Sequence, residues 1–556
     1  MMWLVSLAFA AEPALETAAR AELSRAMVEL RLPDAPPPYL VLMDVLDGHV
    51  ATSFAEGGAL VSHDTEPYRN LRTEVRVGDY TVDSSNFFAF GEPDGVVARR
   101  LPVEDDVRAL RREIWLAVDG SYKHAVEQYS RKLAARRGDS SPRAADYAPA
   151  PATTGAFEAA PADPADAEKM RQLAVRLSAE AGAPPQVEVG QAITRDWQGR
   201  RLLLTSEGTQ RWVSTGFTVV RVEGTARLPD GSEVTDARWW VARRPSLLPP
   251  EEEMIASVRE MASWLAGLQT APIEEDYLGP VLFEGPAASE LFSQLLAAEI
   301  SGSPPSEEDI GGVATPARSP VVRPGRRLLP DGWTVVDDTT TEAPVAGAYA
   351  LDHEGVAPKR VELVQDGVLR ALLMSRIPRK DLTGSTGHGR SLGNERRAAI
   401  PAVVTVTPRR AASKRRILRT GLRLAAQTGR DYLLVIRRIV PPGLVQNIDV
   451  SFSGEGPPPG LTPPYEAYRL YADGRREPVR SLQFSGVDRR VLRDIALAGA
   501  NTGPVDMLDG PPGPARFSIG ATGGVPVTWD VPSVLIAEME LDGAGGGEPR
   551  AMAVPR

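Results

Sequence analysis

Cysteine is absent from the 556-residue sequence. A chain without a thiol cannot form a disulfide bond, hold an iron–sulfur cluster, ligate zinc through sulfur or use a cysteine nucleophile. Proteins of reducing and of oxidising compartments can both lack cysteine, so this absence selects no compartment.

Histidine is scarce as well. The five histidines are His49, His63, His124, His353 and His388, and no two of them are four residues apart, as a helix-borne zinc pair would be. His353 is followed by a glutamate, as in a zincin motif, but no second histidine follows and a turn is predicted there. Zinc requires clustered ligands. Each histidine is therefore interpreted as a surface or hydrogen-bonding residue.

Two nucleotide-binding motifs are also missing. The sequence contains neither a G-x-x-x-x-G-K-[ST] phosphate loop nor a G-x-G-x-x-G after a predicted strand. Runs of acids do occur, for example Glu251–Glu253 and Asp337-Asp338. We interpret them as helix N-termini or solvated loops, where carboxylates are common, and not as acid–base pairs.

Long apolar runs are lacking, since no stretch reaches the roughly 18 residues that span a bilayer. A shorter apolar run opens the chain, MMWLVSLAFAAEP, and its Ala8-Phe9-Ala10 resembles a signal-peptidase site. We therefore predict residues 1–13 as a signal peptide or an N-terminal tail. A signal peptide would make the protein periplasmic or exported, and without one it would be cytoplasmic. No membrane span is expected.

The chain is acidic, with a formal net charge of -10 and a pI near 5.4. Such a field does not favour nucleic acid, and no nucleic-acid partner is expected. The most basic stretch is Pro408–Arg423, in which Arg415, Arg419 and Arg423 share a helical face. A nucleic-acid or acidic-peptide site is one interpretation of that face. A solvated helix face balanced by nearby acids is the favoured one.

Apolar spacing and turn residues predict an α+β fold. Helices are predicted at 14–31, 104–136 (as one or two helices), 165–181, 251–268, 287–299, 411–428 and 488–498. Strands fill most of the rest, in runs that are segregated from the helices, which is typical of α+β proteins. Three Asp-Gly pairs predict hairpin turns, at Asp47-Gly48, Asp366-Gly367 and Asp473-Gly474. The strand that starts at Arg72 alternates polar and apolar residues, which predicts an exposed face.

Length and composition predict two domains, because one core rarely serves so long a chain. An N-terminal domain is expected at 14–270 and a β-rich C-terminal domain at 271–556. Residues 138–168 are rich in Ala, Pro, Asp and Ser and are predicted as a flexible insertion in the first domain.

Several segments, taken in order, resemble the TldD/PmbA (TldD/TldE) family of zinc peptidases and their partner subunits. They include RNLRTEVRVGDYTVDSSNFF and LLLTSEGTQRW in the first half, and LPDGWTVVDD, DHEGV, QDGVLRALLMSR and STGHGR in the second. The resemblance covers nearly the whole chain after the leader. It implies an N-terminal α+β domain, a β-rich C-terminal domain, and a dimer around a cavity that admits extended peptides.

The resemblance also implies that the zinc site is lost. The active subunit of the family carries H-E-x-x-x-H on a helix and a cysteine as the third ligand. Here the matching segment is GPVLFEGPAASELFSQLL, which puts Glu284 at the catalytic glutamate and Phe283 and Ala288 at the two histidines. Ser518 falls near the cysteine position. Because phenyl and methyl groups cannot ligate zinc, no bound metal is expected.

Three functions remain open at this point. The favoured one is a non-catalytic, TldE-like subunit that pairs with a TldD-like paralogue, or with itself, and binds extended peptides. The second is a peptidase with other ligands, such as His353, His388 and Asp352. The third is a stand-alone peptide-binding envelope protein, which could take a peptide at an exposed strand edge.

Overall fold

The structure is a computed structural model that describes residues 13–89, 95–137, 143–155, 164–274, 276–304, 307–310, 313–316, 322–391, 396–441, 461–501, 503–509 and 524–543. The chain is mixed α+β, with a strand-rich second half, as predicted. In the part of the chain that the structure describes, no helix combines the length and the apolar character needed to cross a membrane.

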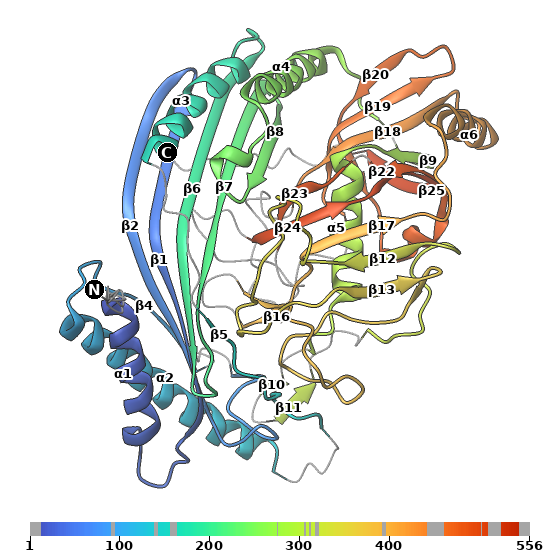
Figure 1. Cartoon of the computed structure of the whole chain (residues 1–556). Coiled ribbons are helices and arrows are strands. Elements are labelled where there is room, and N and C mark those ends of the chain that lie inside the picture. Colours follow the sequence, from blue (N-terminus) through green and yellow to red (C-terminus); the bar gives the residue numbers. More distant parts are fainter. Residues whose placement is uncertain are drawn as a thin grey trace, which may run out of the picture.

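A large, mostly antiparallel sheet forms the first half (Figure 1). Its strands are β4 (Val96–Arg100), β2 (Ala59–Val77), β1 (Pro38–Glu56), β6 (Val187–Thr205), β7 (Gln210–Arg227), β8 (Glu233–Ala242) and the short β5 (Thr154–Gly155). Tight turns at Glu207-Gly208 and Asp230-Gly231 connect β6 to β7 and β7 to β8.

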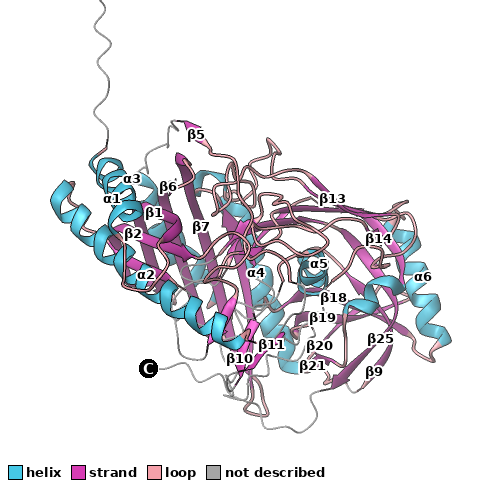
Figure 2. Cartoon of the chain, turned by 90° about the horizontal axis from the view of Figure 1, so that it is seen from below, coloured by secondary structure: helices cyan, strands magenta, loops and turns pink. Residues whose placement is uncertain are grey.

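Four helices cover one face of this sheet. They are α1 (Ala14–Glu29), α2 (Val107–Ala135), α3 (Pro164–Ala181) and α4 (Glu251–Gly267). The first pair packs on β1, β2 and β6 around residues such as Val41 and Met43, and the second pair packs on the other end of the long strands. Figure 2 shows α1, α2 and α3 on the outer side of the strands, with the loops of the second domain on the inner side.

The prediction of a hairpin turn at Asp47-Gly48 was wrong. Both residues lie inside β1, opposite Arg69 and Tyr68 of β2. Gly48 permits a close strand contact there, because a Cβ would lie 2.2 Å from the carbonyl oxygen of Gln198 on β6. The Asp47 carboxylate accepts hydrogen bonds from Arg69 and Arg200, so a turn-forming residue serves as a cross-strand partner.

Two further predictions need correction at their edges. The predicted insertion 138–168 ends in helix, since α3 begins at Pro164, while 138–142 and 156–163 lie outside the described residues. The helix predicted at 488–498 is a short 3-10 helix, η4 (Arg489–Asp494), followed by strand β22 (Ile495–Asn501), which pairs with β25. By contrast, α2 is one continuous helix through Asp119 and Gly120.

The second half contains two sheets with a buried helix between them (Figure 1). The first consists of β20 (Arg476–Val479), β19 (Pro464–Tyr471), β18 (Tyr432–Ile439), β9 (Tyr277–Phe283), β25 (Pro532–Gly543), β21 (Leu482–Phe484) and β22. The second consists of β14 (Val368–Leu369), β13 (Val361–Gln365), β12 (Thr334–Asp337), β17 (Val403–Thr407), β24 (Val525–Asp530) and β23 (Val505–Asp509). The helix is α5 (Pro286–Ile300).

Small sheets and one outer helix complete the domain. The small sheets are β15 (Gly389–Arg390) with β16 (Ala398–Ala399), and β3 (Phe87–Ala89) with β10 (Glu307–Ile310) and β11 (Val313–Pro316). The outer helix α6 (Lys414–Gln427) packs Ile417 on the sheet that contains β9. The predicted turns at Asp366-Gly367 and Asp473-Gly474 are confirmed.

The basic face of α6 points to solvent as predicted, but its balancing acids are not found. Arg415, Arg419 and Arg423 are exposed, and among the described residues none of the three has an ion pair. Only Lys414, at the start of the helix, contacts an acid, Glu284.

A buried group of charges joins the two domains, and we call it the interdomain charge cluster. Its residues are Asp44, Arg72, Glu74, Arg76, Asp83, Arg201 and Arg397. Glu74 accepts from Arg72 at 3.1 Å, from Arg76 at 2.8 Å, and from Arg397, which lies in the sequence of the second domain. The prediction of an exposed face on this strand was therefore wrong, because the second domain covers it.

Electrostatics explain why these charges tolerate burial. Burial alone would raise the pKa of Glu74, but Arg76, Arg397 and Arg72 outweigh it and hold that pKa far below its ordinary value. Beside the cluster, the ring of Tyr147 lies between two guanidinium groups, with Arg76 at 3.6 Å and Arg376 at 4.3 Å from its centre. Arg376 in turn donates to Glu207 of the first domain.

Glu74→Gln should lower the free energy of unfolding by about 3–5 kcal/mol, because it leaves buried arginines without their shared counter-charge. Glu188→Gln is a matched control, since Glu188 pairs with Arg227 on the surface and exposed pairs contribute less than about 1 kcal/mol. Urea denaturation measures both. Equal effects of the two changes would contradict a central role for Glu74.

The contribution of Glu74 should also depend on pH. Its folded-state pKa is depressed, so its stabilisation is present above the unfolded-state pKa of about 4.3 and is lost as the pH falls below it. The stability difference between the wild type and Glu74→Gln should therefore be largest near neutral pH and shrink toward about pH 3. Denaturation curves recorded across this range test it, and a difference that grows in acid would refute the assignment.

Candidate functional site

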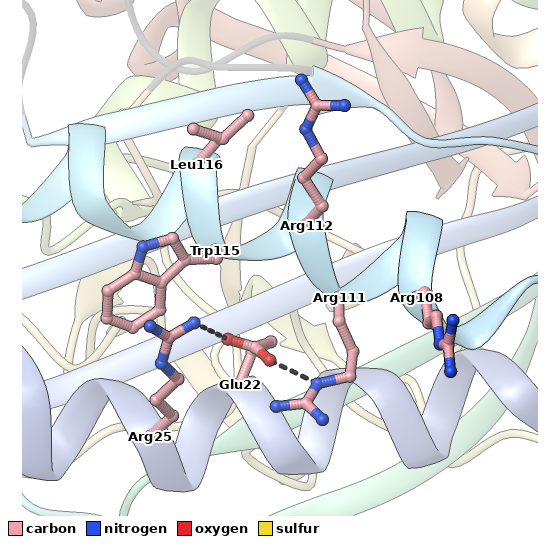
Figure 3. A pocket seen from close by; sticks show the side chains of 7 residues that line it. All are labelled: Glu22, Arg25, Arg108, Arg111, Arg112, Trp115 and Leu116. Atoms are coloured by element: carbon pink, nitrogen blue, oxygen red, sulfur yellow. Dashed lines mark hydrogen bonds and ion pairs between the residues drawn. The ribbon is translucent and has the colours of Figure 1, made fainter.

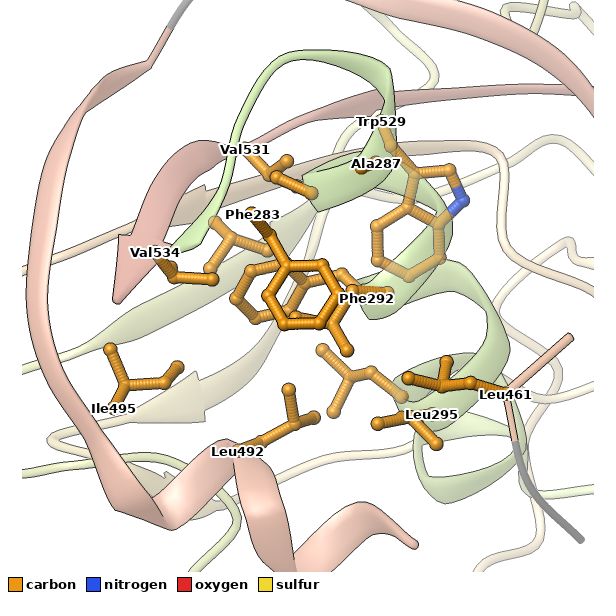
Figure 4. Close-up of a cluster of buried hydrophobic side chains, with 14 of the residues drawn as sticks. Phe283, Ala287, Phe292, Leu295, Leu461, Leu492, Ile495, Trp529, Val531 and Val534 are labelled. Carbon is orange, nitrogen blue, oxygen red and sulfur yellow. The ribbon is translucent and has the colours of Figure 1, made fainter. Parts of the chain in front are cut away.

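The candidate site is the junction between β9 and α5, where the sequence analysis placed the matching segment of the zinc motif. Phe283 is the last residue of β9 and its side chain is fully buried. Its ring is stacked with that of Phe484, with 6.2 Å between the centroids. Figure 4 shows Phe283 surrounded by apolar side chains that include Phe292, Val531 and Val534.

Glu284 follows Phe283 and braces the junction. Its backbone amide donates to the carbonyl oxygen of Ile436 at 3.0 Å. Its carboxylate lies 3.3 Å from Nζ of Lys414 and accepts from the Tyr468 hydroxyl at 3.5 Å. Burial, reinforced by the Glu284 charge, raises the pKa of Tyr468 to about 12. These contacts attach the junction to β18, β19 and α6.

The next residues start the helix. Gly285 has φ 56 and ψ -133, a conformation that glycine adopts readily and other residues do not. Pro286 occupies the first turn of α5, where its missing N–H costs nothing. Ala288 is buried, and its amide donates to the Gly285 carbonyl at 3.0 Å. Phe283 and Glu284 therefore precede the helix, whereas the resemblance implied that the whole motif lies on one.

Helix α5 is buried on almost every side. Eleven of its residues are buried, which is typical of a helix that lies between two sheets. Two polar side chains on it contact neighbouring segments: buried Glu299 binds Arg489 at 2.5 Å, and half-buried Gln294 donates to Thr462 at 2.9 Å.

These residues do not fit a zinc ion. The phenyl ring of Phe283 and the methyl group of Ala288 carry no lone pair, and both lie in apolar packing. Moving the register of the motif along α5 would not help, because residues 276–304 contain no histidine or cysteine. Ser518 lies outside the described residues. Within the described ranges, no three His, Cys, Asp or Glu side chains are grouped as metal ligands would be.

His353 is half-buried in the turn D-H-E-G, whose other three residues are buried. Nδ1 of His353 accepts from the Ser391 amide at 3.1 Å, so this lone pair is occupied. Burial and the nearby Arg201 keep the pKa of His353 well below its ordinary value, and the ring is neutral. Asp352 accepts three backbone amides, from Glu354, Val356 and Gly389, and burial next to Glu354 raises its pKa to about 7.

His388 occupies a second buried polar site. Its Nδ1 lies 2.9 Å from the Thr386 hydroxyl, and its Nε2 lies 3.5 Å from Asp337. Burial would raise the pKa of Asp337, but His388 and two backbone amides lower it instead. The two histidines are thus each fixed by their own loop contacts, which fits structural roles in this domain.

One short motif was missed when the sequence was searched for catalytic patterns, because no G-x-S-x-G was recognised there. Residues 389–393 spell G-x-S-x-G, the pattern of a serine nucleophile elbow. An elbow needs a strand that turns into a helix. Here Ser391 follows the two-residue strand β15, and its backbone amide, not its hydroxyl, contacts His353. Among the described residues, β15 is followed by its antiparallel partner β16 and not by a helix.

Comparisons with known proteins agree with this architecture. Residues 276–543 match the PmbA/TldA metallopeptidase C-terminal domain. A metalloprotease from Archaeoglobus fulgidus is 37% identical over 71 residues, which cover 13% of this chain and 16% of that protein. The chain therefore matches only a small part of that relative's length.

Solved structures resemble the chain over nearly its full length. TldE from Thermococcus kodakarensis has a TM-score of 0.60 at 14% identity, covering 95% of this chain and 100% of its own. A candidate DNA gyrase modulator from Bacteroides thetaiotaomicron has 0.59 at 11%, covering 95% and 98%. Another from Thermotoga maritima has 0.56 at 14%, covering 90% and 96%. At these identities, the likeness establishes the fold alone.

Phe283→Ala should destabilise the protein by about 3–5 kcal/mol, because it opens a cavity in the core between the two sheets. The adjacent Glu284→Gln should change stability by less than about 1 kcal/mol, since its ion-pair partner Lys414 is largely exposed. Chemical denaturation compares the two neighbours. A small effect of Phe283→Ala would show that this position is not packed as a core residue.

Proposed function

Because this chain belongs to the TldD/PmbA family, we propose that it is a non-catalytic, TldE-like subunit. In this role it pairs with a zinc-bearing paralogue and contributes one wall of a chamber that receives extended peptides. The paralogue supplies the metal and the catalytic glutamate, and this chain supplies binding surface and shape.

One observation carries the proposal. The positions assigned to the family's histidines, Phe283 and Ala288, are occupied by side chains that pack an apolar core. A peptidase of this kind needs a metal to lower the pKa of its nucleophilic water. Glu284, at the position assigned to the catalytic glutamate, is instead engaged with Lys414 and Tyr468. The contacts of all three residues thus support a structural role for the junction.

The alternative of a peptidase with other ligands receives less support from the geometry. Nδ1 of His353 already accepts a backbone amide, and Asp352 already accepts three. Recruiting either residue to a metal would break these buried hydrogen bonds. A stand-alone peptide-binding protein remains the second candidate, because it needs the same fold without a paralogue.

Metal analysis and peptide cleavage test the proposal. The purified chain should hold no stoichiometric zinc and should not cut an unstructured peptide. Mixed with a paralogue that carries H-E-x-x-x-H, it should form a stable complex that contains zinc and cuts the peptide. Glu284→Gln in this chain should leave that cleavage unchanged, whereas a glutamine at the paralogue's motif glutamate should abolish it.

Two results would contradict the proposal. Stoichiometric zinc and cleavage by the isolated chain would mean that other ligands form an active site. Failure to bind any such paralogue, together with measurable binding of uncut peptides by the isolated chain, would favour the stand-alone peptide-binding protein.

A further inference from the structure

A hollow that is unrelated to the zinc motif lies between α1 and α2 on the outer surface. Its volume is about 370 Å³, within the range typical of ligand pockets. We call it the α1–α2 groove. Figure 3 shows the side chains that line it, which are Glu22, Arg25, Arg108, Arg111, Arg112, Trp115 and Leu116.

The groove carries excess positive charge, because its lining contains four arginines and one glutamate. Glu22 is almost fully buried and is already shared, since it accepts from Arg111 at 2.6 Å and from Arg25 at 3.5 Å. Arg25 also binds Glu29 and stacks on Trp115, with its guanidinium carbon 3.7 Å from the ring centre. Glu22, the one acid among the lining residues, is therefore already paired with arginines of the groove.

Two arginines of the groove are accessible to a binding partner. Arg108 and Arg112 are exposed, and in the described part of the chain the side chain of neither has an ion pair or hydrogen bond. They are four residues apart on α2, which places them about 6 Å apart along the helix axis. Their side chains extend in opposite directions from α2 (Figure 3), so two separate acids of a partner would be needed to pair with both.

The same surface is apolar in part. The indole of Trp115 is half-buried under Arg25, and Leu116 next to it is 42% exposed. Val28, one turn beyond Arg25 on α1, is 72% exposed. Tryptophan and arginine together are the residues most enriched at the centres of protein interfaces. A phosphate ion or a nucleic-acid backbone would leave this apolar part uncovered.

We propose that the α1–α2 groove docks an acidic, amphipathic segment of a partner protein. Its carboxylates pair with Arg108 and Arg112, and an apolar side chain covers Trp115 and Leu116. This is the helix-in-groove mode of recognition, with charge added at one edge. The inference does not depend on the proposed subunit role, because the groove lies on the first domain and uses none of the β9–α5 residues.

A fluorescent acidic peptide, with leucine and phenylalanine placed between glutamates, is the probe. The full-length protein should bind it, and Arg108→Glu with Arg112→Glu should weaken binding by about tenfold or more. Arg415→Glu with Arg419→Glu on α6 is the matched control, because it makes the same change of charge at the same spacing. This control should leave the affinity within about twofold.

A further variant tests the apolar half. Leu116→Ser should weaken peptide binding while leaving the thermal midpoint unchanged, since Leu116 is exposed. An equal loss of peptide affinity in the groove variant and in the α6 control would show that the effect comes from the overall charge of the protein. That result would overturn the proposal. Tighter binding of inorganic phosphate or of a DNA duplex than of the peptide, lost in the groove variant, would overturn it too.

Discussion

Buried ion pairs that converge on the carboxylate of Glu74 link the two domains. It sits on a long central strand of the first sheet, and arginines from both halves of the chain converge on it. Buried arginines cannot lose such a partner without a large penalty. The position of Arg397, and with it the loops that carry His353 and His388, is therefore coupled to the first sheet.

At the β9–α5 junction, apolar residues occupy the positions that the family resemblance assigns to metal ligands. Phe283 and Ala288 fill the core between two sheets, and Glu284 keeps polar contacts with Lys414 and Tyr468. An apolar side chain in such a place contributes packing energy where a metal site would need preorganised polar ligands. Such packing stabilises the domain, and it is compatible with the proposed subunit, whose partner would supply the reaction.

The sequence allowed the local elements to be predicted well and the environment of charged residues poorly. The turns at Asp366-Gly367 and Asp473-Gly474 were confirmed because the Asp-Gly signal acts within four residues. Asp47-Gly48 carries the same signal, yet Gly48 is there for contact with a strand far along the chain. The face of β2 that includes Glu74 has the alternation of an exposed strand, and only the second domain buries it.

Some features of the candidate site could likewise be predicted from the sequence, and others could not. The absence of histidine and cysteine around α5 is visible in the sequence, and it leaves the segment without imidazole or thiolate groups. That Phe283 ends a strand, and does not begin a helix, depends on Gly285 and on packing against Phe484. The α1–α2 groove could not be foreseen, because Arg25 and Arg112 come from helices whose pairing is decided by the core beneath them.

The sharing of one carboxylate by several arginines has an evolutionary consequence. Glu74 forms ion pairs with Arg72, Arg76 and Arg397 at once. A substitution at any of these four positions therefore cannot be compensated by a single substitution at another. Among related chains these positions should thus change together or stay fixed as a block. The amino-acid sequence at the interface between the domains would then change more slowly during evolution than the sequence of the surfaces on either side.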